Sequence, residues 1–105
     1  MIHHNHPSAL ELLSGLPGAE FILKGLNDHH EKRSTISSCL VRIARPRLIR
    51  AGLMEPSPQH DIQAELDLYQ LLASEGNQAH SRYNALIREL ISFEHALDHR
   101  LSKAS

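Results

Sequence analysis

The feature that most constrains the fold is a long apolar stripe in the last quarter of the chain. Apolar residues recur there at alternating steps of three and four positions, namely Tyr83, Leu86, Leu90, Phe93, Leu97 and Leu101, with Ala79 and Ile87 alongside. This spacing places them on one face of an α-helix. We expect a helix over residues 78 to 102, about 37 Å long. A helix of this length extends beyond a small globule, so its apolar stripe also predicts a partner subunit.

Two shorter helices are predicted at the N-terminal end. Ser8 stands three residues before Glu11, a capping-box pattern that predicts a short helix ending between Gly15 and Gly18. Pro17 suits the start of a second helix over about residues 18 to 31. The apolar face of this second helix contains Ala19, Ile22, Leu23 and Leu26, and His30 falls on the same face as an expected core residue, whereas Gly25 weakens the helix prediction.

A third helix begins near residue 34, where Ser34 is the expected N-cap. Its apolar face consists of Ile36, Cys39, Leu40 and Ile43. Pro46 must end or kink this helix, and Gly52 is placed to end a short continuation. Residues 52–59 are rich in proline and are predicted to form a linker between helices.

The fourth predicted helix covers about residues 59 to 75 and ends at Gly76. It carries Ile62, Leu66, Tyr69 and Ala73 on one side, with Leu68 and Leu72 widening that stripe and Leu71 nearly opposite. No segment of the chain alternates between apolar and polar residues, so no sheet is expected. We therefore predict an all-α fold of four to five helices, packed as an orthogonal or bundle-like single domain around the long C-terminal helix.

The chain is expected to be one domain over residues 1–105, with residues 1–7 as a flexible N-terminal tail. Cys39 is the only cysteine, so no internal disulfide can form and a reducing, cytoplasmic location is expected. No secretory signal or apolar run of about 18 residues is visible, so no contact with a membrane is predicted.

Charged residues separate into two consecutive blocks. Residues 32–54 contain six Lys or Arg and no acid, whereas residues 55–81 contain five Asp or Glu and no Lys or Arg. We interpret this pattern as two neighbouring helices that pack with complementary flanks. The alternative is a nucleic-acid interface made of Arg42, Arg45, Arg47 and Arg50. A net charge of −1 provides no long-range attraction toward phosphates.

Histidine is enriched, with nine residues in 105. His95 and His99 are one helical turn apart, a spacing that lets two imidazoles share a metal ion. His29 and His30 are the candidates to complete a zinc site. At the N-terminus, the α-amino group, two backbone nitrogens and His3 form a donor set that suits Cu(II) or Ni(II). A metal-binding protein that uses Zn or Cu is therefore an alternative hypothesis; the main expectation is no cofactor.

Residues able to support catalysis do not form an assembled set. Cys39 lies on an apolar helix face and is expected to be an inert core thiol. Glu94 lies on the apolar face of the last helix, so we expect it to pair with an Arg or His from another helix.

Arg88 and His95 are separated by six residues on one flank of the last predicted helix. This spacing resembles the Arg-x4–6-His motif of HEPN-domain RNases. Members of that family are small α-helical dimers in which the Arg and His of both subunits meet at a cleft and cleave RNA. The resemblance implies an RNase activity at Arg88 and His95 as a further alternative.

The main functional hypothesis is a small non-enzymatic helical protein that acts through protein–protein interaction. We expect it to self-associate as a homodimer and to serve a regulatory or adaptor role. The expected interface residues are Leu68, Leu71 and Ile91, because they are the excess apolar side chains of the last two helices.

Overall fold

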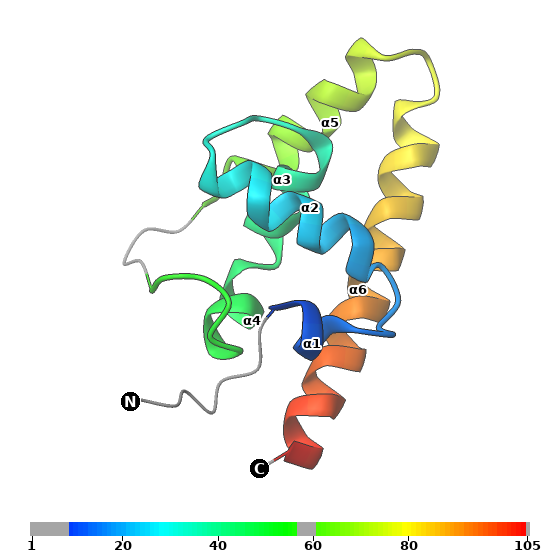
Figure 1. Ribbon diagram of the computed structural model, residues 1–105. Coiled ribbons are helices and arrows are strands. Elements are labelled where there is room, and N and C mark those ends of the chain that lie inside the picture. Colours follow the sequence, from blue (N-terminus) through cyan, green and yellow to red (C-terminus); the bar gives the residue numbers. More distant parts are fainter. Residues whose placement is uncertain (1–8, 57–60, 105) are drawn as a thin grey trace.

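The computed structural model describes residues 9–56 and 61–104, and these two ranges form six α-helices and no β-strand (Figure 1). The helices are α1 (Ala9–Leu13), α2 (Ala19–His30), α3 (Ile36–Ile43), α4 (Arg45–Arg50), α5 (Ala64–Ser74) and α6 (Ala79–Ala104). The all-α prediction is confirmed. The count exceeds four to five because residues 45–50 form a separate helix. The predicted cap Ser8, the tail over residues 1–7 and part of the 52–59 linker lie outside the described residues.

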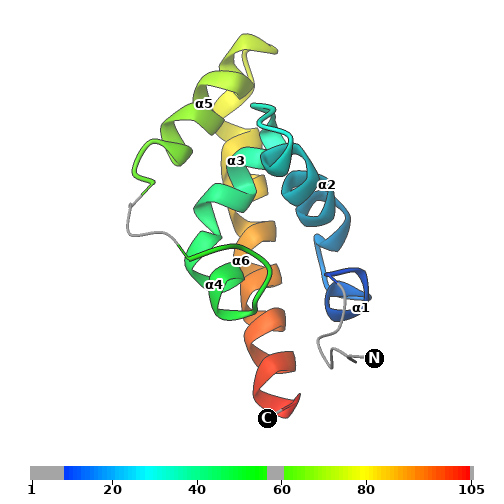
Figure 2. The same cartoon turned by 60° about the vertical axis from the view of Figure 1, so that its left-hand side comes forward.

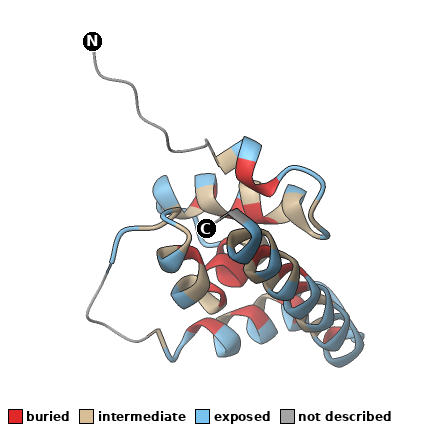
Figure 3. Ribbon diagram, turned by 90° about the horizontal axis from the view of Figure 1, so that it is seen from below, coloured by how far each residue is buried: buried red, intermediate tan, exposed pale blue. Residues whose placement is uncertain are grey.

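The long C-terminal helix is confirmed and determines the shape of the molecule. α6 has 26 residues, and the molecule measures 52 × 24 × 21 Å. The other helices pack along one side of α6, while its outer side is exposed (Figures 1 and 3). Leu90, Phe93 and Leu97 are fully or almost fully buried on the packed side. Near its C-terminal end, the Arg100 guanidinium donates to the carbonyl of Leu12 at 2.7 Å and thereby ties α6 to α1.

α3 occupies the middle of the fold, between α2 and α5 (Figure 2). Its N-cap is Thr35 and not Ser34: the Ser38 backbone donates to the Thr35 side chain, and the Thr35 backbone donates to the Ser38 hydroxyl. This reciprocal capping box satisfies two backbone N–H groups at the start of α3, which therefore begins at Ile36. Pro46 stands in the first turn of α4, where a missing N–H is tolerated, and Gly52 follows the helix at φ +79°.

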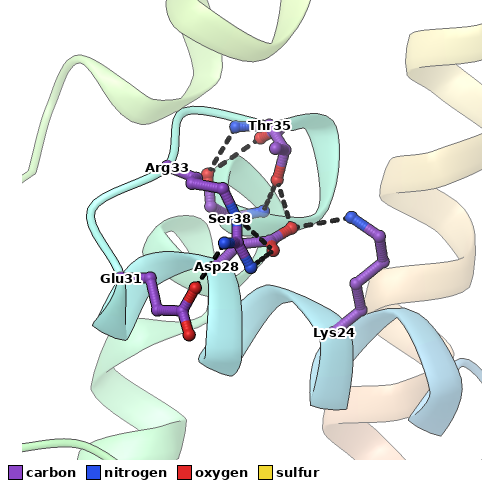
Figure 4. Close-up of polar contacts among 6 residues, drawn as sticks. All are labelled: Lys24, Asp28, Glu31, Arg33, Thr35 and Ser38. Atoms are coloured by element: carbon purple, nitrogen blue, oxygen red, sulfur yellow. Dashed lines mark hydrogen bonds and ion pairs between the residues drawn. The ribbon is translucent and has the colours of Figure 1, made fainter.

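The joint between α2 and α3 is built around Asp28, which is only 3% exposed (Figure 4). Its carboxylate accepts hydrogen bonds from Lys24 at 2.7 Å, from Thr35 at 2.7 Å and from Arg33 at 2.9 Å. The bond from Lys24, followed by those from Thr35 and Arg33, holds the pKa of Asp28 well below its ordinary value. Asp28 therefore connects the end of α2 to the cap of α3.

Replacing Asp28 with asparagine is expected to lower the unfolding temperature by several degrees at pH 7. The folded chain has the lower Asp28 pKa, so the stabilising effect of the carboxylate is complete above about pH 4 and decreases as the pH falls below it. The difference between the wild-type chain and Asp28→Asn should therefore shrink below about pH 4. Thermal unfolding at a series of pH values measures this. The control is Glu89→Gln, an exposed carboxylate on α6; a pH-independent difference would contradict the prediction.

Candidate interaction surface

The apolar side chains predicted to share one side of the fourth helix divide between core and solvent. Ala64, Leu68 and Leu72 are at most 1% exposed and pack into the core. In contrast, Ile62 is 85% exposed and Leu66 is 48% exposed. The helix also begins at Ala64 rather than near residue 59. The prediction that Leu68 and Leu72 widen the Ile62–Leu66 side was therefore wrong.

The exposed stripe of α5 continues onto α6 through an aromatic pair. Tyr69, which is 38% exposed, lies against Tyr83 with the ring centroids 5.6 Å apart and the ring planes at 58°. The Tyr83 hydroxyl donates to the Glu65 carboxylate at 3.4 Å. Burial and the neighbouring Glu65 charge raise the pKa of Tyr83, so this hydroxyl stays protonated at neutral pH.

We define the α5–α6 apolar surface as Ile62, Leu66, Tyr69 and Tyr83. Between the two helices it is hollowed by a cavity of about 370 Å³, lined by Glu65, Leu66, Tyr69, His80, Tyr83 and Asn84. Exposed aromatic rings beside aliphatic side chains are typical of protein–protein contacts. This surface can therefore exclude water against an apolar partner.

The residues predicted to form an interface divide between core and surface. Leu68 is fully buried within the chain, and Leu71 is half-buried against the core. Ile91 is 44% exposed on α6. The predicted set therefore missed Leu66 and Tyr69 as surface residues. The charge pattern could not have found them, because Leu66 and Leu68 lie about 100° to either side of Asp67 on the helix.

The predicted charge complementarity between neighbouring helices is confirmed. Arg42 of α3 contacts Asp61 at 2.6 Å and Asp67 of α5 at 2.9 Å. The hydrogen bond from Arg42 lowers the pKa of Asp61, although partial burial opposes this shift. The pairing explains how α3 and α5 adopt their relative orientation.

A second arginine of the basic block also has partners within the chain. Arg47 lies 3.5 Å from Glu94 and 3.3 Å from Asp98, both on α6. This confirms that Glu94 pairs with an arginine from another helix. Burial nevertheless raises the pKa of Glu94, with Arg47 opposing the shift. Of the four arginines proposed to bind nucleic acid, Arg50 is exposed and Arg45 is partly buried.

The structure does not bring the candidate metal ligands together within residues 9–56 and 61–104. No group of three His, Cys, Asp or Glu side chains is placed to hold a metal ion there. His95 and His99 are exposed on α6, and His29 is partly buried at the end of α2. His30 is exposed, which corrects its assignment to the core. His3 lies outside the described residues.

Two further candidates for catalysis can be located. Cys39 is completely buried, as predicted for a core thiol, and burial raises its pKa. Arg88 and His95 are both exposed on α6, about two helical turns apart. The HEPN-like RNase hypothesis stays a prediction.

No helix in the described part of the chain is both long enough and apolar enough to cross a membrane. Comparison with known protein families, curated protein sequences and solved structures finds no match to this chain. Its function must therefore be inferred from its own surfaces.

Proposed function

We propose that the protein is a non-enzymatic interaction module that self-associates through the α5–α6 apolar surface. One observation carries the proposal: the exposed side chains of Leu66 and Tyr69 line a hollow with Tyr83, and Ile62 is exposed just before α5. Covering apolar area contributes about 25 cal/mol per Å². The buried, unpaired thiol of Cys39 supports a reducing compartment such as the cytoplasm as its location.

The occupant we propose is a second copy of the chain. A two-fold interface places the same patch on both subunits, so its edges must be complementary to each other. The rim of this surface meets that condition, because Glu65 lies on the α5 side and His80 on the α6 side. In the proposed dimer, a two-fold axis through the hollow would pair Glu65 of each copy with His80 of the other. This pairing favours a homodimer over binding to a partner of uniform charge.

Nucleic-acid binding through the basic block has less support. Arg42 and Arg47 are both engaged by carboxylates of the same chain. Phosphate binding there would need these ion pairs to break, leaving acidic groups beside the ligand.

The interface is tested by replacing Leu66 with lysine and measuring mass by sedimentation equilibrium. An ammonium group would be buried without a partner in the dimer, so we expect the dissociation constant to rise at least about tenfold. Folding should change little, because Leu66 is already half exposed. The matched control is Leu10→Lys, which places the same change on α1 at a leucine that is 66% exposed. This control should dimerise normally.

Two results would contradict the proposal. One is a wild-type chain that stays monomeric at about 1 mM, which means an association free energy weaker than about 4 kcal/mol. The other is equal dimerisation by Leu66→Lys and the wild-type chain, which would place the interface elsewhere.

A further inference from the structure

A second hollow lies on the part of the molecule formed by α2, α4 and the segment that follows α4. It has a volume of about 600 Å³, within the range of small-molecule sites. Its wall consists of Leu26, His29 and His30 from α2, Arg45 and Ile49 from α4, and Gly52, Leu53, Met54, Glu55 and Pro56 after α4. The site differs from the α5–α6 apolar surface in having a basic side.

Arg45 supplies the positive charge of this pocket. Among the described residues, no carboxylate lies within ion-pair distance of Arg45, unlike Arg42 and Arg47 of the same basic block. Its Nε is buried and has no hydrogen-bond partner. A partly buried guanidinium without an ion-pair partner is unfavourable, and an anion bound at its terminal nitrogens would supply the paired charge and accept their hydrogen bonds.

His29 lies beside Arg45 in the pocket wall and is partly buried. Burial is the main cause that lowers its pKa, followed by the charges of Arg45 and Arg42; His30 acts in the same direction and Asp61 against it. The imidazole is therefore neutral at pH 7 and can donate one hydrogen bond. Glu55 is the one acid in the wall; it is exposed, and among the described residues no ion pair joins it to Arg45.

The remaining wall is largely apolar. Leu26 of α2, Ile49 of α4 and Leu53 and Met54 after α4 all line the cavity. A ligand that matches this wall needs a hydrocarbon body and one anionic end. We propose that the pocket binds a small organic carboxylate with an apolar body, its carboxylate at Arg45 and His29 and its body against Leu26, Ile49 and Leu53. The site shares no residue with the proposed dimer interface, so the pocket proposal and the dimer proposal can fail independently.

The test is isothermal titration calorimetry with octanoate below its micelle concentration. We expect saturable binding to the wild-type chain and at least about tenfold weaker binding to Arg45→Met, which keeps the apolar stem but removes the charge. Octanol, the neutral analogue, should bind more weakly by a similar factor. The control is Arg50→Met, which makes the same change at an exposed arginine of α4 outside the pocket. It should bind octanoate normally.

A second readout follows the His29 imidazole by NMR. A carboxylate bound beside it should raise the pKa of His29, because the negative charge stabilises the protonated ring. Arg45→Met should remain folded, since the change removes a buried N–H that has no partner.

Three outcomes would overturn the inference. The first is an absence of binding at millimolar octanoate, and the second is equal affinity for the wild-type chain and Arg45→Met. The third is loss of octanoate binding in Leu66→Lys while Arg45→Met binds normally. The last would show that octanoate binds the α5–α6 apolar surface and not this pocket.

Discussion

Replacing Gly25 with alanine is expected to reduce the free energy of unfolding by about 2 to 3 kcal/mol. A Cβ at this position would lie 2.2 Å from the Ser37 carbonyl oxygen and 2.6 Å from a methyl carbon of Val41. The Ser37 oxygen belongs to the backbone of α3 and cannot move away as a side-chain end would. α2 and α3 would have to separate at their closest approach, loosening the centre of the core.

Whether Gly25→Ala lowers or raises the free energy of unfolding tests the close packing of α2 against α3. In an isolated helix, the same substitution stabilises by about 1 kcal/mol. Urea unfolding followed by circular dichroism measures the net change. Asn27→Ala, an exposed change in the same helix, is the control and should stay within about 0.5 kcal/mol of the wild-type chain. An unchanged or increased stability in Gly25→Ala would show that α2 and α3 do not pack this closely.

The second large effect is expected at Leu68, and its matched control is Leu66 two residues earlier. Leu68→Ala should cost about 3 kcal/mol of stability, because the side chain is fully buried and its removal leaves a cavity in the core. Leu66→Ala should cost less than about 1 kcal/mol, because Leu66 is 48% exposed.

Dimerisation should show the opposite order, with Leu66→Ala weakening it more than Leu68→Ala does. Leu66→Ala removes contact area from the proposed interface and should weaken the dimer. Urea unfolding at a concentration where the chain is monomeric measures the first effect, and sedimentation equilibrium measures the second. If Leu66→Ala destabilises the monomer more than Leu68→Ala does, Leu66 and not Leu68 packs into the core. The α5–α6 apolar surface then does not exist.

Much of the fold followed from local patterns. The apolar stripe over residues 79–101 repeats at the helical period, and this property does not depend on neighbouring segments. The break at Pro46 and the turn at Gly52 likewise follow from backbone chemistry. The opposite charges of residues 32–54 and 55–81 indicated a contact between helices, and Arg42 makes it. Glu94 was expected to have a basic partner because a carboxylate on an apolar face needs one.

The candidate sites were less accessible to sequence reasoning. The pocket beside Arg45 collects residues from α2, α4 and the segment after α4, and no local spacing connects them. The apolar side chains of α5 were recognised, but Leu68 was assigned to the interface and Leu66 and Tyr69 were not. Gly25 reduced the expectation of a helix, although it is the residue that lets α2 approach α3.

The sequence by itself determined the helices, their approximate ends and the all-α class, because helix formation depends on residues within a few turns of each other. Only the tertiary structure decided which stripe of α5 is buried, why Gly25 is small and which arginine lacks a carboxylate partner. The two stripes of α5 contain similar apolar residues, so burying either contributes a similar free energy. The choice is made by the contacts of α5 with α3 and α6, which come from distant parts of the chain.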